Sequence, residues 1–205
     1  GGLTDLGREA VQKMEGLGMW LDVSHLNNDG FSEICACAGR PFIASHSDAW
    51  EIHPNYRNLK DGQIEALAAR GGVIGVNACA LLAGTGPGAS GRADAGKAGE
   101  TKKAGQPAAS LCGARETALS QLARHVEYLV EKAGEAHVGL GLDLCRGLSE
   151  ATPRIRFQTD SDDILAHHGE LLKLTAILLS RGMKEETVAA VAGGNFLRFF
   201  RERLP

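Results

Sequence analysis

Short apolar runs that alternate with helix-forming segments are the feature that most constrains the fold of this chain. Four such runs lie at 19–24, 42–45, 73–77 and 138–142. They are apolar at positions that face both sides of a strand, which is typical of buried parallel strands. Strands that alternate with helices predict a parallel sheet with helices packed against it. We therefore predict an α/β fold.

The residues between and after these runs show helical periodicity and helix-start signals. We predict helices at about 4–17, 28–39, 63–70, 116–133, 162–181, 185–192 and 195–203. Residues 83–110 are rich in Gly, Ala, Lys and Pro and contain almost no large apolar side chain. Such a composition cannot build a core, so we expect a flexible surface insertion there.

Four strand–helix units make half of an eight-unit (β/α) barrel of the TIM type, which typically takes about 250 residues. A half-barrel leaves two apolar strand edges open, and such edges invite pairing with another chain. The 205 residues are therefore predicted to form an incomplete barrel. We expect a homo-oligomer, or a partner that covers the edges, rather than an isolated monomer.

Composition excludes several classes of function. The formal net charge is −3, and no cluster of Lys and Arg with interleaved aromatics suggests nucleic-acid binding. No apolar run approaches the roughly 20 residues that cross a bilayer. The five cysteines include no CxxC pair, which argues against a disulfide framework or a thiolate zinc site. Reduced thiols slightly favour the cytoplasm.

Two histidines stand at the ends of the first two runs. His25 and His46 each follow a serine, and the carboxyl ends of strands are where α/β folds place their chemistry. We interpret the pair as ligands of a shared metal ion, although a histidine at a strand end can also be a hydrogen-bonded structural residue. The other histidines show no such pairing and are expected to be structural or solvated: His53, His125, His137, His167 and His168.

Longer motifs around these residues resemble the membrane dipeptidase (renal dipeptidase, peptidase M19) family. The match runs nearly end to end and is broken mainly at 83–110. The motifs are Gly2-Leu3-Thr4-x-x-Gly7-Arg8-Glu9, Leu17-Gly18-Met19-x-Leu21-Asp22-Val23-Ser24-His25, Ala44-Ser45-His46-Ser47, Arg57-Asn58-Leu59, Arg70-Gly71-Gly72-Val73-Ile74-Gly75-Val76-Asn77, Val138-Gly139-x-Gly141-x-Asp143 and Gly193-Gly194-Asn195-Phe196-Leu197-Arg198.

The resemblance implies a (β/α)8 barrel with two zinc ions that hydrolyses dipeptides by a metal-bridged hydroxide. The chain would be the C-terminal half of that barrel, beginning at the helix before the fifth strand. His25 and His46 match the two histidine ligands of the second zinc. Arg57 matches the arginine that holds the terminal carboxylate of the substrate, and Asp143 matches the aspartate proposed to shuttle a proton.

The family pattern is incomplete here. The His-x-Asp motif of the first zinc, the bridging glutamate and a substrate-binding histidine correspond to positions before residue 1. The chain would thus hold at most a partial zinc site, and we expect it to be inactive without the N-terminal half or a second chain. The usual Asp-Phe-Asp-Gly is replaced by Asp143-Leu144-Cys145-Arg146-Gly147, so the second aspartate of the family motif is missing from this loop.

Two other functions stay open from the sequence. A non-catalytic half-barrel could serve as an assembly or binding module through its open edges. An amidohydrolase-type enzyme acting on another amide or a lactone is a weaker option. Taken alone, Asp143 could also be a loop acid, and Arg57 an ordinary surface cation.

Overall fold

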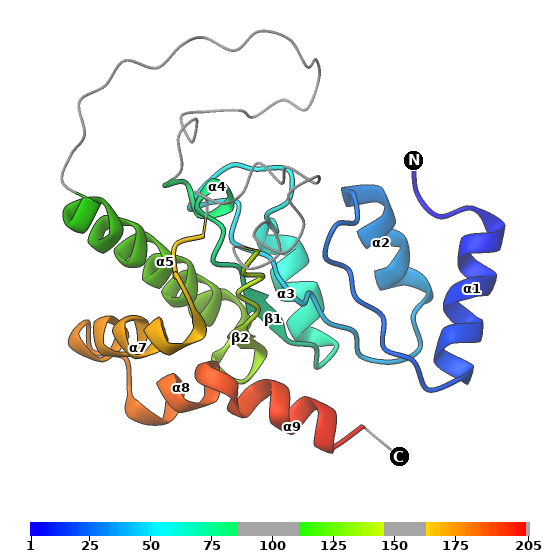
Figure 1. Cartoon of the computed structure of the whole chain (residues 1–205). Helices are drawn as coiled ribbons and strands as arrows, with labels where there is room; N and C mark the ends of the chain where they lie inside the picture. Colours follow the sequence, from blue (N-terminus) through cyan, green and yellow to red (C-terminus); the bar gives the residue numbers. More distant parts are fainter. Residues whose placement is uncertain (86–110, 146–162, 204–205) are drawn as a thin grey trace, which may run out of the picture.

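The computed structural model describes residues 1–85, 111–145 and 163–203, with the backbone alone for 111–116. Two short strands lie at the centre of Figure 1, with helices arranged around them. The strands are β1 (Ile74–Val76) and β2 (Val138–Leu140). The α-helices are α1 (Asp5–Gly16), α2 (Asn28–Cys37), α3 (Asp61–Ala69), α4 (Ala80–Ala83), α5 (Leu111–Ala133), α7 (Leu171–Ser180), α8 (Glu185–Ala189) and α9 (Asn195–Arg201).

The four apolar runs lie side by side in chain order and run parallel. β1 pairs with β2 in the register Ile74 to Val138. Single parallel bridges extend the sheet, from Asp22 to Ile43 and from Ala44 to Ile74. The prediction of a parallel α/β arrangement is thus confirmed in its coarse form.

The prediction of four full strands is wrong in the described residues, because the runs 19–24 and 42–45 form bridges only. A side chain takes the place of a neighbouring strand there. The Asp22 carboxylate accepts the backbone N–H groups of Ser24 and Ser45, at 3.0 and 2.9 Å. Donors that bond to a carboxylate are not available for a ladder, so regular pairing stops where the predicted site residues begin.

Local capping signals place the first helices correctly. The Thr4 hydroxyl accepts the backbone N–H of Gly7 at the start of α1, and Asn27 Oδ1 accepts that of Gly30 in α2. Each bond satisfies a backbone donor that the first helical turn leaves free.

Other boundaries need correction. Helix α5 begins at Leu111 instead of residue 116, and α4 occupies Ala80–Ala83, where no helix was predicted and where the predicted insertion begins at residue 83. Residues 163–167 are not helical. The predicted break before residue 195 is present, because the chain kinks at Gly193, which has non-helical φ and ψ angles. Most of the predicted insertion, 86–110, lies outside the described residues.

The core lies between the strands and the helices. Both faces of β1 are buried. Ile64 and Leu67 of α3 and Leu122 and Leu129 of α5 are completely buried. A second cluster joins Ile43 and Val73 to Phe199 of α9. Ile43 and Val73 lie near the starts of their runs, so α9 covers the amino ends of the runs. The carboxyl ends stay available for a site. Within the described ranges no helix is long and apolar enough to cross a membrane.

Candidate active site

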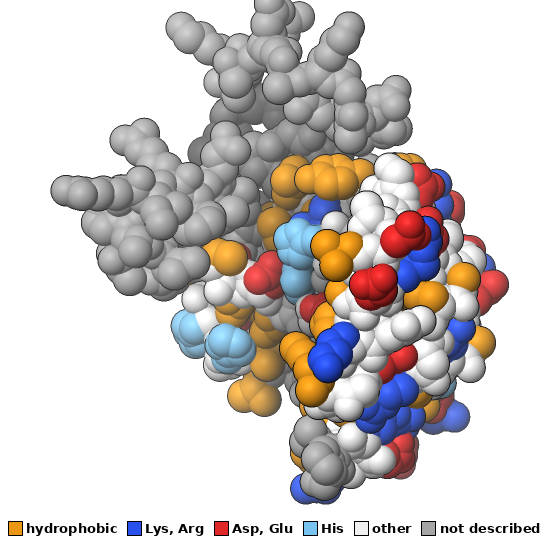
Figure 2. Space-filling view, turned by 90° about the vertical axis from the view of Figure 1, so that its right-hand side faces the viewer, with side chains coloured by type: hydrophobic (Ala, Val, Ile, Leu, Met, Phe, Trp, Pro, Cys, Tyr) orange, Lys and Arg blue, Asp and Glu red, His pale blue; other side chains and the backbone are white. Residues whose placement is uncertain are grey.

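The structure brings together three of the four predicted site residues, from runs far apart in the sequence. The imidazole centroids of His25 and His46 lie 4.9 Å apart, with the rings inclined by 66°. His46 Nε2 lies 4.0 Å from Asp143 Oδ2. All three residues follow the carboxyl end of an apolar run, as the parallel arrangement predicts. Figure 2 shows histidine side chains at the surface close to acidic and basic ones.

His25 and Asp143 share an uncommon backbone conformation. Their φ angles are 75° and 52°, and no other non-glycine residue in the described ranges has a positive φ. A residue with a Cβ pays for this left-handed geometry, and such residues concentrate at functional sites. The two side chains are thereby turned toward the shared point at the end of the sheet.

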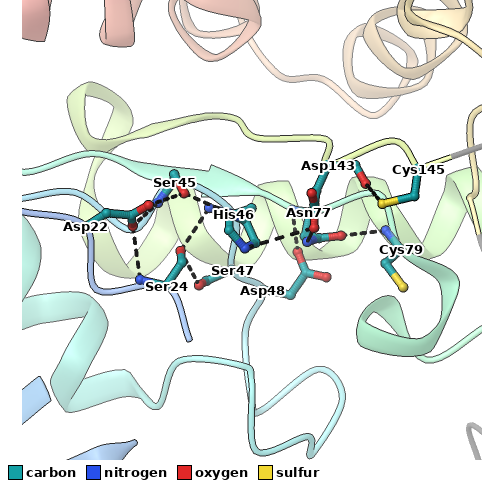
Figure 3. Close-up of polar contacts among 10 residues, drawn as sticks. All are labelled: Asp22, Ser24, Ser45, His46, Ser47, Asp48, Asn77, Cys79, Asp143 and Cys145. Carbon is teal, nitrogen blue, oxygen red and sulfur yellow. Dashed lines mark hydrogen bonds and ion pairs between the residues drawn. The ribbon is translucent and has the colours of Figure 1, made fainter. Parts of the chain in front are cut away.

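His46 is held by hydrogen bonds from both of the first two runs (Figure 3). Its Nδ1 lies 2.7 Å from Ser45 Oγ, and the Ser45 hydroxyl lies 2.5 Å from Asp22 Oδ2. Its backbone N–H donates to Ser24 Oγ at 3.0 Å, and Ser24 Oγ lies 3.2 Å from Ser47 Oγ. Ser45 therefore bonds to the ring of His46, whereas Ser24 bonds only to its backbone.

The two ring nitrogens of His46 differ in their hydrogen bonding: Nδ1 is bonded and, among the described residues, Nε2 is not. Nε2 is buried and has no hydrogen-bond partner in the described part of the chain. The 4.0 Å to Asp143 is too long for a hydrogen bond. A buried polar atom without a partner needs an explanation, and Nε2 is a suitable ligand for a metal ion.

Arg57 supplies positive charge to the same region. Its Nε and Nη2 atoms are buried and lack hydrogen-bond partners among the described residues. Burial, followed by the charges of Arg57 and His46, lowers the pKa of His25, while the carboxylates of Asp143 and Asp22 oppose the shift. An arginine with free donors is suited to a carboxylate ligand, which it can hold through two parallel bonds.

A buried carboxyl beneath the site was not foreseen from the sequence. Asp48 is completely buried, and its Oδ1 accepts the backbone N–H of Asn77 at 3.0 Å. Burial raises the pKa of Asp48 to about 8, against the effect of this hydrogen bond. Asn77 in turn places its Nδ2 3.5 Å from Asp143 Oδ2. The signal available beforehand was the polar Asn77 at the end of the third apolar run.

Two glycines allow the segment that carries His46 to cross close to the sheet. A Cβ on Gly75 would lie 2.0 Å from the carbonyl oxygen of Ser45, and one on Gly141 only 1.7 Å from it. Since real contacts are never that short, both positions require glycine for steric reasons. This accounts physically for two glycines of the motifs noted above.

The loop after β2 departs from the family pattern at Cys145. The Cys145 thiol lies 3.3 Å from the carbonyl oxygen of Asp143, and its backbone N–H donates to Asp163 Oδ2 at 3.0 Å. These contacts give Cys145 a part in shaping the Asp143 turn. Arg146 lies outside the described residues.

Two of the other histidines have structural contacts. His125 is completely buried in α5, where Nδ1 accepts the backbone N–H of Ala49 and Nε2 lies 3.3 Å from the carbonyl oxygen of Ala83. His137 Nδ1 lies 2.8 Å from the carbonyl oxygen of Gly72. Their ring nitrogens are thus engaged by the backbone, as a structural role requires.

The described residues fit a metal ion only in part. Imidazole nitrogens are suitable zinc ligands, and His25 and His46 stand close enough to share an ion. No group of three His, Cys, Asp or Glu side chains in the described ranges is arranged to hold one. The two histidines therefore form part of a site that needs further ligands.

A groove in the described part of the molecule lies away from these residues. It has a volume of about 490 Å³ and lies between α2 and α3, lined by Phe31, Cys35, Lys60 and Gln63 among others. None of the predicted site residues lines it, so the site is assigned to the ends of the strands.

Comparison with protein families gives one match over nearly the whole chain. The model of the membrane dipeptidase family (peptidase family M19) matches residues 1–203. An uncharacterized protein of Klebsiella pneumoniae is 35% identical over 143 residues, covering 69% of this chain and 44% of that protein. A dipeptidase of Aspergillus oryzae is 25% identical over 199 residues, and mouse dipeptidase 3 is 26% identical over 207. The chain spans 38% and 33% of those two relatives.

Solved structures agree on the fold. A metallopeptidase named dipeptidase AC superposes with a TM-score of 0.69 at 24% identity, over 98% of this chain and 49% of its own. A metallopeptidase of Rhodobacter sphaeroides was solved with a phosphinate mimic of the dipeptide L-Ala-D-Ala. It superposes with a TM-score of 0.68 at 24% identity, over 98% of this chain and 47% of its own. The chain therefore has an α/β fold that corresponds to about half of these structures.

Proposed function

This chain belongs to the membrane dipeptidase family, peptidase family M19, and from that premise we propose that it is one half of the active site of a zinc-dependent dipeptidase. In this proposal His25 and His46 are metal ligands, Arg57 binds the substrate and Asp143 is catalytic. The first-metal ligands come from outside residues 1–205, either from the rest of the protein or from a second chain. Residues 1–205 would form the C-terminal half of the (β/α)8 barrel of that enzyme.

The meeting of His25, His46 and Asp143 at the carboxyl ends of the sheet carries the proposal. The 4.9 Å between the two imidazoles and the unpartnered Nε2 of His46 support a shared cation. When bound, zinc ions polarise the scissile carbonyl and lower the pKa of water. Two imidazoles fall short of the three protein ligands usual at a catalytic zinc site, so this chain alone should bind zinc weakly.

The remaining residues act on the substrate. The free donors of Arg57 would form a bidentate pair with the C-terminal carboxylate of a dipeptide, which fixes its direction in the site. Asp143 is about half exposed at 49%, so a substrate can reach it. Its carboxylate would take a proton from the attacking water and return it to the leaving amine. The Asn77 amide, 3.5 Å away, would orient that carboxylate.

Zinc binding to the purified chain tests the ligand assignment. The chain is stripped with a chelator, and zinc affinity is measured by competition with a chromophoric chelator. We expect weak binding that is lost in His25→Ala and His46→Ala. His168→Ala, at an exposed position that none of the predicted ligands occupies, serves as the matched control. Affinity that is unchanged in both His25→Ala and His46→Ala would exclude these ligands.

Dipeptide hydrolysis tests the other half of the proposal. The chain alone should show no turnover, whereas the complete protein should cleave dipeptides with a free C-terminal carboxylate only when zinc is present. Robust hydrolysis by the 205-residue chain would contradict the assignment of the remaining ligands to another segment.

A non-catalytic assembly module is the second candidate. Met19, at the start of the first run, is 50% exposed, and Leu17 and Leu6, which precede it, are 65% and 74% exposed. Apolar side chains near an open sheet edge favour a covering partner or a second copy. Analytical ultracentrifugation would support this candidate if the chain forms a stable dimer and binds no zinc.

A further inference from the structure

We propose that Asp22 and Ser45 are positioning residues that fix the tautomer of His46, with its proton on Nδ1 and the lone pair of Nε2 free for a divalent metal ion. The metal part rests on the proposed function. The tautomer part stands on hydrogen bonds within the chain and can be tested without metal.

The direction of each hydrogen bond follows from the donors available. An ionised carboxylate only accepts, and Asp22 accepts the backbone N–H groups of Ser24 and Ser45 through Oδ1. Its Oδ2 lies 2.5 Å from Ser45 Oγ, so the hydroxyl must donate its single proton to Asp22. The Ser45 oxygen can then only accept from His46 Nδ1, 2.7 Å away. The proton of the imidazole is therefore on Nδ1 (Figure 3).

The second ring nitrogen agrees with this assignment. A proton on Nε2 would be a buried donor without an acceptor, because the nearest carboxylate oxygen, Oδ2 of Asp143, is 4.0 Å away. A lone pair on Nε2 avoids that cost and is the form that binds zinc. Histidine ligands commonly bond through the other ring nitrogen to a carboxylate or another polar group, which sets the tautomer. Here a serine hydroxyl stands between the imidazole and the carboxylate.

A purely structural role for Asp22 is the competing explanation. Asp22 ties the first run to the second through backbone N–H groups, and this function does not need the Ser45 hydroxyl. Ser45→Ala removes the link to the ring and leaves those backbone bonds in place. A structural tie predicts no change in His46 upon this substitution, whereas tautomer control predicts a change.

Asp22→Asn gives a sharper test because it should reverse the tautomer. The amide oxygen can still accept from the two backbone N–H groups. The amide nitrogen, replacing Oδ2, would donate to Ser45 Oγ. The Ser45 hydroxyl would then turn its proton toward His46 Nδ1, and the ring would carry its own proton on Nε2. Ser45→Thr keeps the hydroxyl and should behave as the wild type.

Ser24→Ala is the matched control. Ser24 Oγ accepts the backbone N–H of His46 but does not bond to the ring. This substitution disturbs the same segment without touching the proposed link, so the tautomer should be unchanged.

The experiment is long-range ¹H–¹⁵N NMR of the chelator-treated 205-residue chain with ¹⁵N-labelled histidine, at a pH where the imidazole is neutral. The His46 signals are assigned by their loss in His46→Asn. We expect a protonated Nδ1 in the wild type, Ser45→Thr and Ser24→Ala, a protonated Nε2 in Asp22→Asn, and loss of the fixed preference in Ser45→Ala. A wild-type His46 with its proton on Nε2 would overturn the proposal, as would the same tautomer in wild type and Ser45→Ala. If Asp22→Asn does not fold, Ser45→Ala alone decides.

Zinc competition gives the second readout. Loss of a partner of a metal-ligating histidine typically costs about 10- to 100-fold in affinity. We expect a loss of this size in Ser45→Ala and Asp22→Asn but not in Ser24→Ala. A wild-type chain with the Nδ1 proton but no zinc binding would retain the positioning role and reject the proposed metal function. Zinc binding that all the variants share would reject the positioning role and keep the metal function.

Discussion

His25 and Asp143, which follow the first and the last of the four parallel runs, have the same left-handed backbone conformation. Their φ angles of 75° and 52° are the positive values found at non-glycine positions in the described chain. This conformation costs an ordinary residue about 1–2 kcal/mol. The site therefore holds conformational strain at both edges of the sheet, at its carboxyl end.

The strain at Asp143 should be measurable as a difference in stability between two substitutions at this position. We expect the free energy of unfolding, measured with urea, to be about 1 kcal/mol higher for Asp143→Gly than for Asp143→Ala. Glycine adopts positive φ without penalty, whereas alanine does not. Both variants lack the carboxylate, so the difference between them reports the backbone. At the exposed helical position Glu65 the order should be reversed, with alanine more stable. An Asp143→Ala variant as stable as Asp143→Gly would contradict the strain.

Gly141 should not tolerate even a methyl group. Its Cβ would lie 1.7 Å from the carbonyl oxygen of Ser45, so Gly141→Ala must displace the segment that carries His46. We expect a loss of about 1–3 kcal/mol in the free energy of unfolding, together with weaker zinc binding. Gly62→Ala in α3, where nothing lies within 4 Å, should instead be neutral or stabilising. Urea unfolding of both variants gives the comparison.

His125 should make the fold sensitive to acid. Burial lowers its pKa from 6.5 to about 4, against the hydrogen bond to Ala83. Between these two values the unfolded chain binds a proton that the folded chain excludes, so the free energy of unfolding falls as the pH falls. The loss begins near pH 6.5, is complete near pH 4 and amounts to about 3 kcal/mol at most.

His125→Asn separates this effect from other titrations. The asparagine oxygen can take the place of Nδ1 as acceptor for the backbone N–H of Ala49. The variant should be less stable at pH 7 but should lose less stability between pH 6.5 and pH 4. Parallel pH-dependent slopes of wild type and variant in urea unfolding would contradict the assignment to His125.

The sequence predicts what depends on short-range signals and on chain direction. The start of α1 follows from its cap Thr4, and α2 is capped by Asn27, one residue before the expected cap at Asn28. The meeting of His25 with His46 follows from the parallel direction of adjacent runs, which puts their carboxyl ends at one edge. These inferences need no knowledge of side-chain packing.

The parts that the sequence did not predict depend on contacts between distant residues. Asp48 and Asn77 are 29 positions apart, and their hydrogen bond exists only once the second and third runs are packed together. The end of regular pairing after Asp22 depends on its carboxylate reaching Ser45 in the neighbouring run. Helix α5 begins at Leu111, ahead of the clear amphipathic pattern, so composition alone did not locate its start.

Asp143→Asn in the complete protein should act mainly on kcat. Asparagine also tolerates the left-handed conformation at this position, so the turn should persist. The lost proton transfer should lower kcat about 10²- to 10⁴-fold with little change in KM. Steady-state kinetics with a dipeptide measures both constants, and an unchanged kcat would remove Asp143 from the mechanism.

Arg57→Ala in the complete protein should act mainly on KM. Its Nε and Nη2 atoms are buried without partners, so they are available to a substrate carboxylate that is present in both the ground state and the transition state. Loss of this charged pair should raise KM about 10- to 100-fold with kcat largely preserved. Arg57→Lys should recover part of the loss, because lysine keeps the charge but not the planar fork.

A substrate control identifies the group that Arg57 holds. A dipeptide amide lacks the terminal carboxylate, so the wild-type enzyme should discriminate against it. Arg57→Ala should lower kcat/KM for the dipeptide but hardly for the amide, which removes most of that discrimination. If the substitution impairs both substrates equally, Arg57 supports the fold of its loop and does not bind the carboxylate.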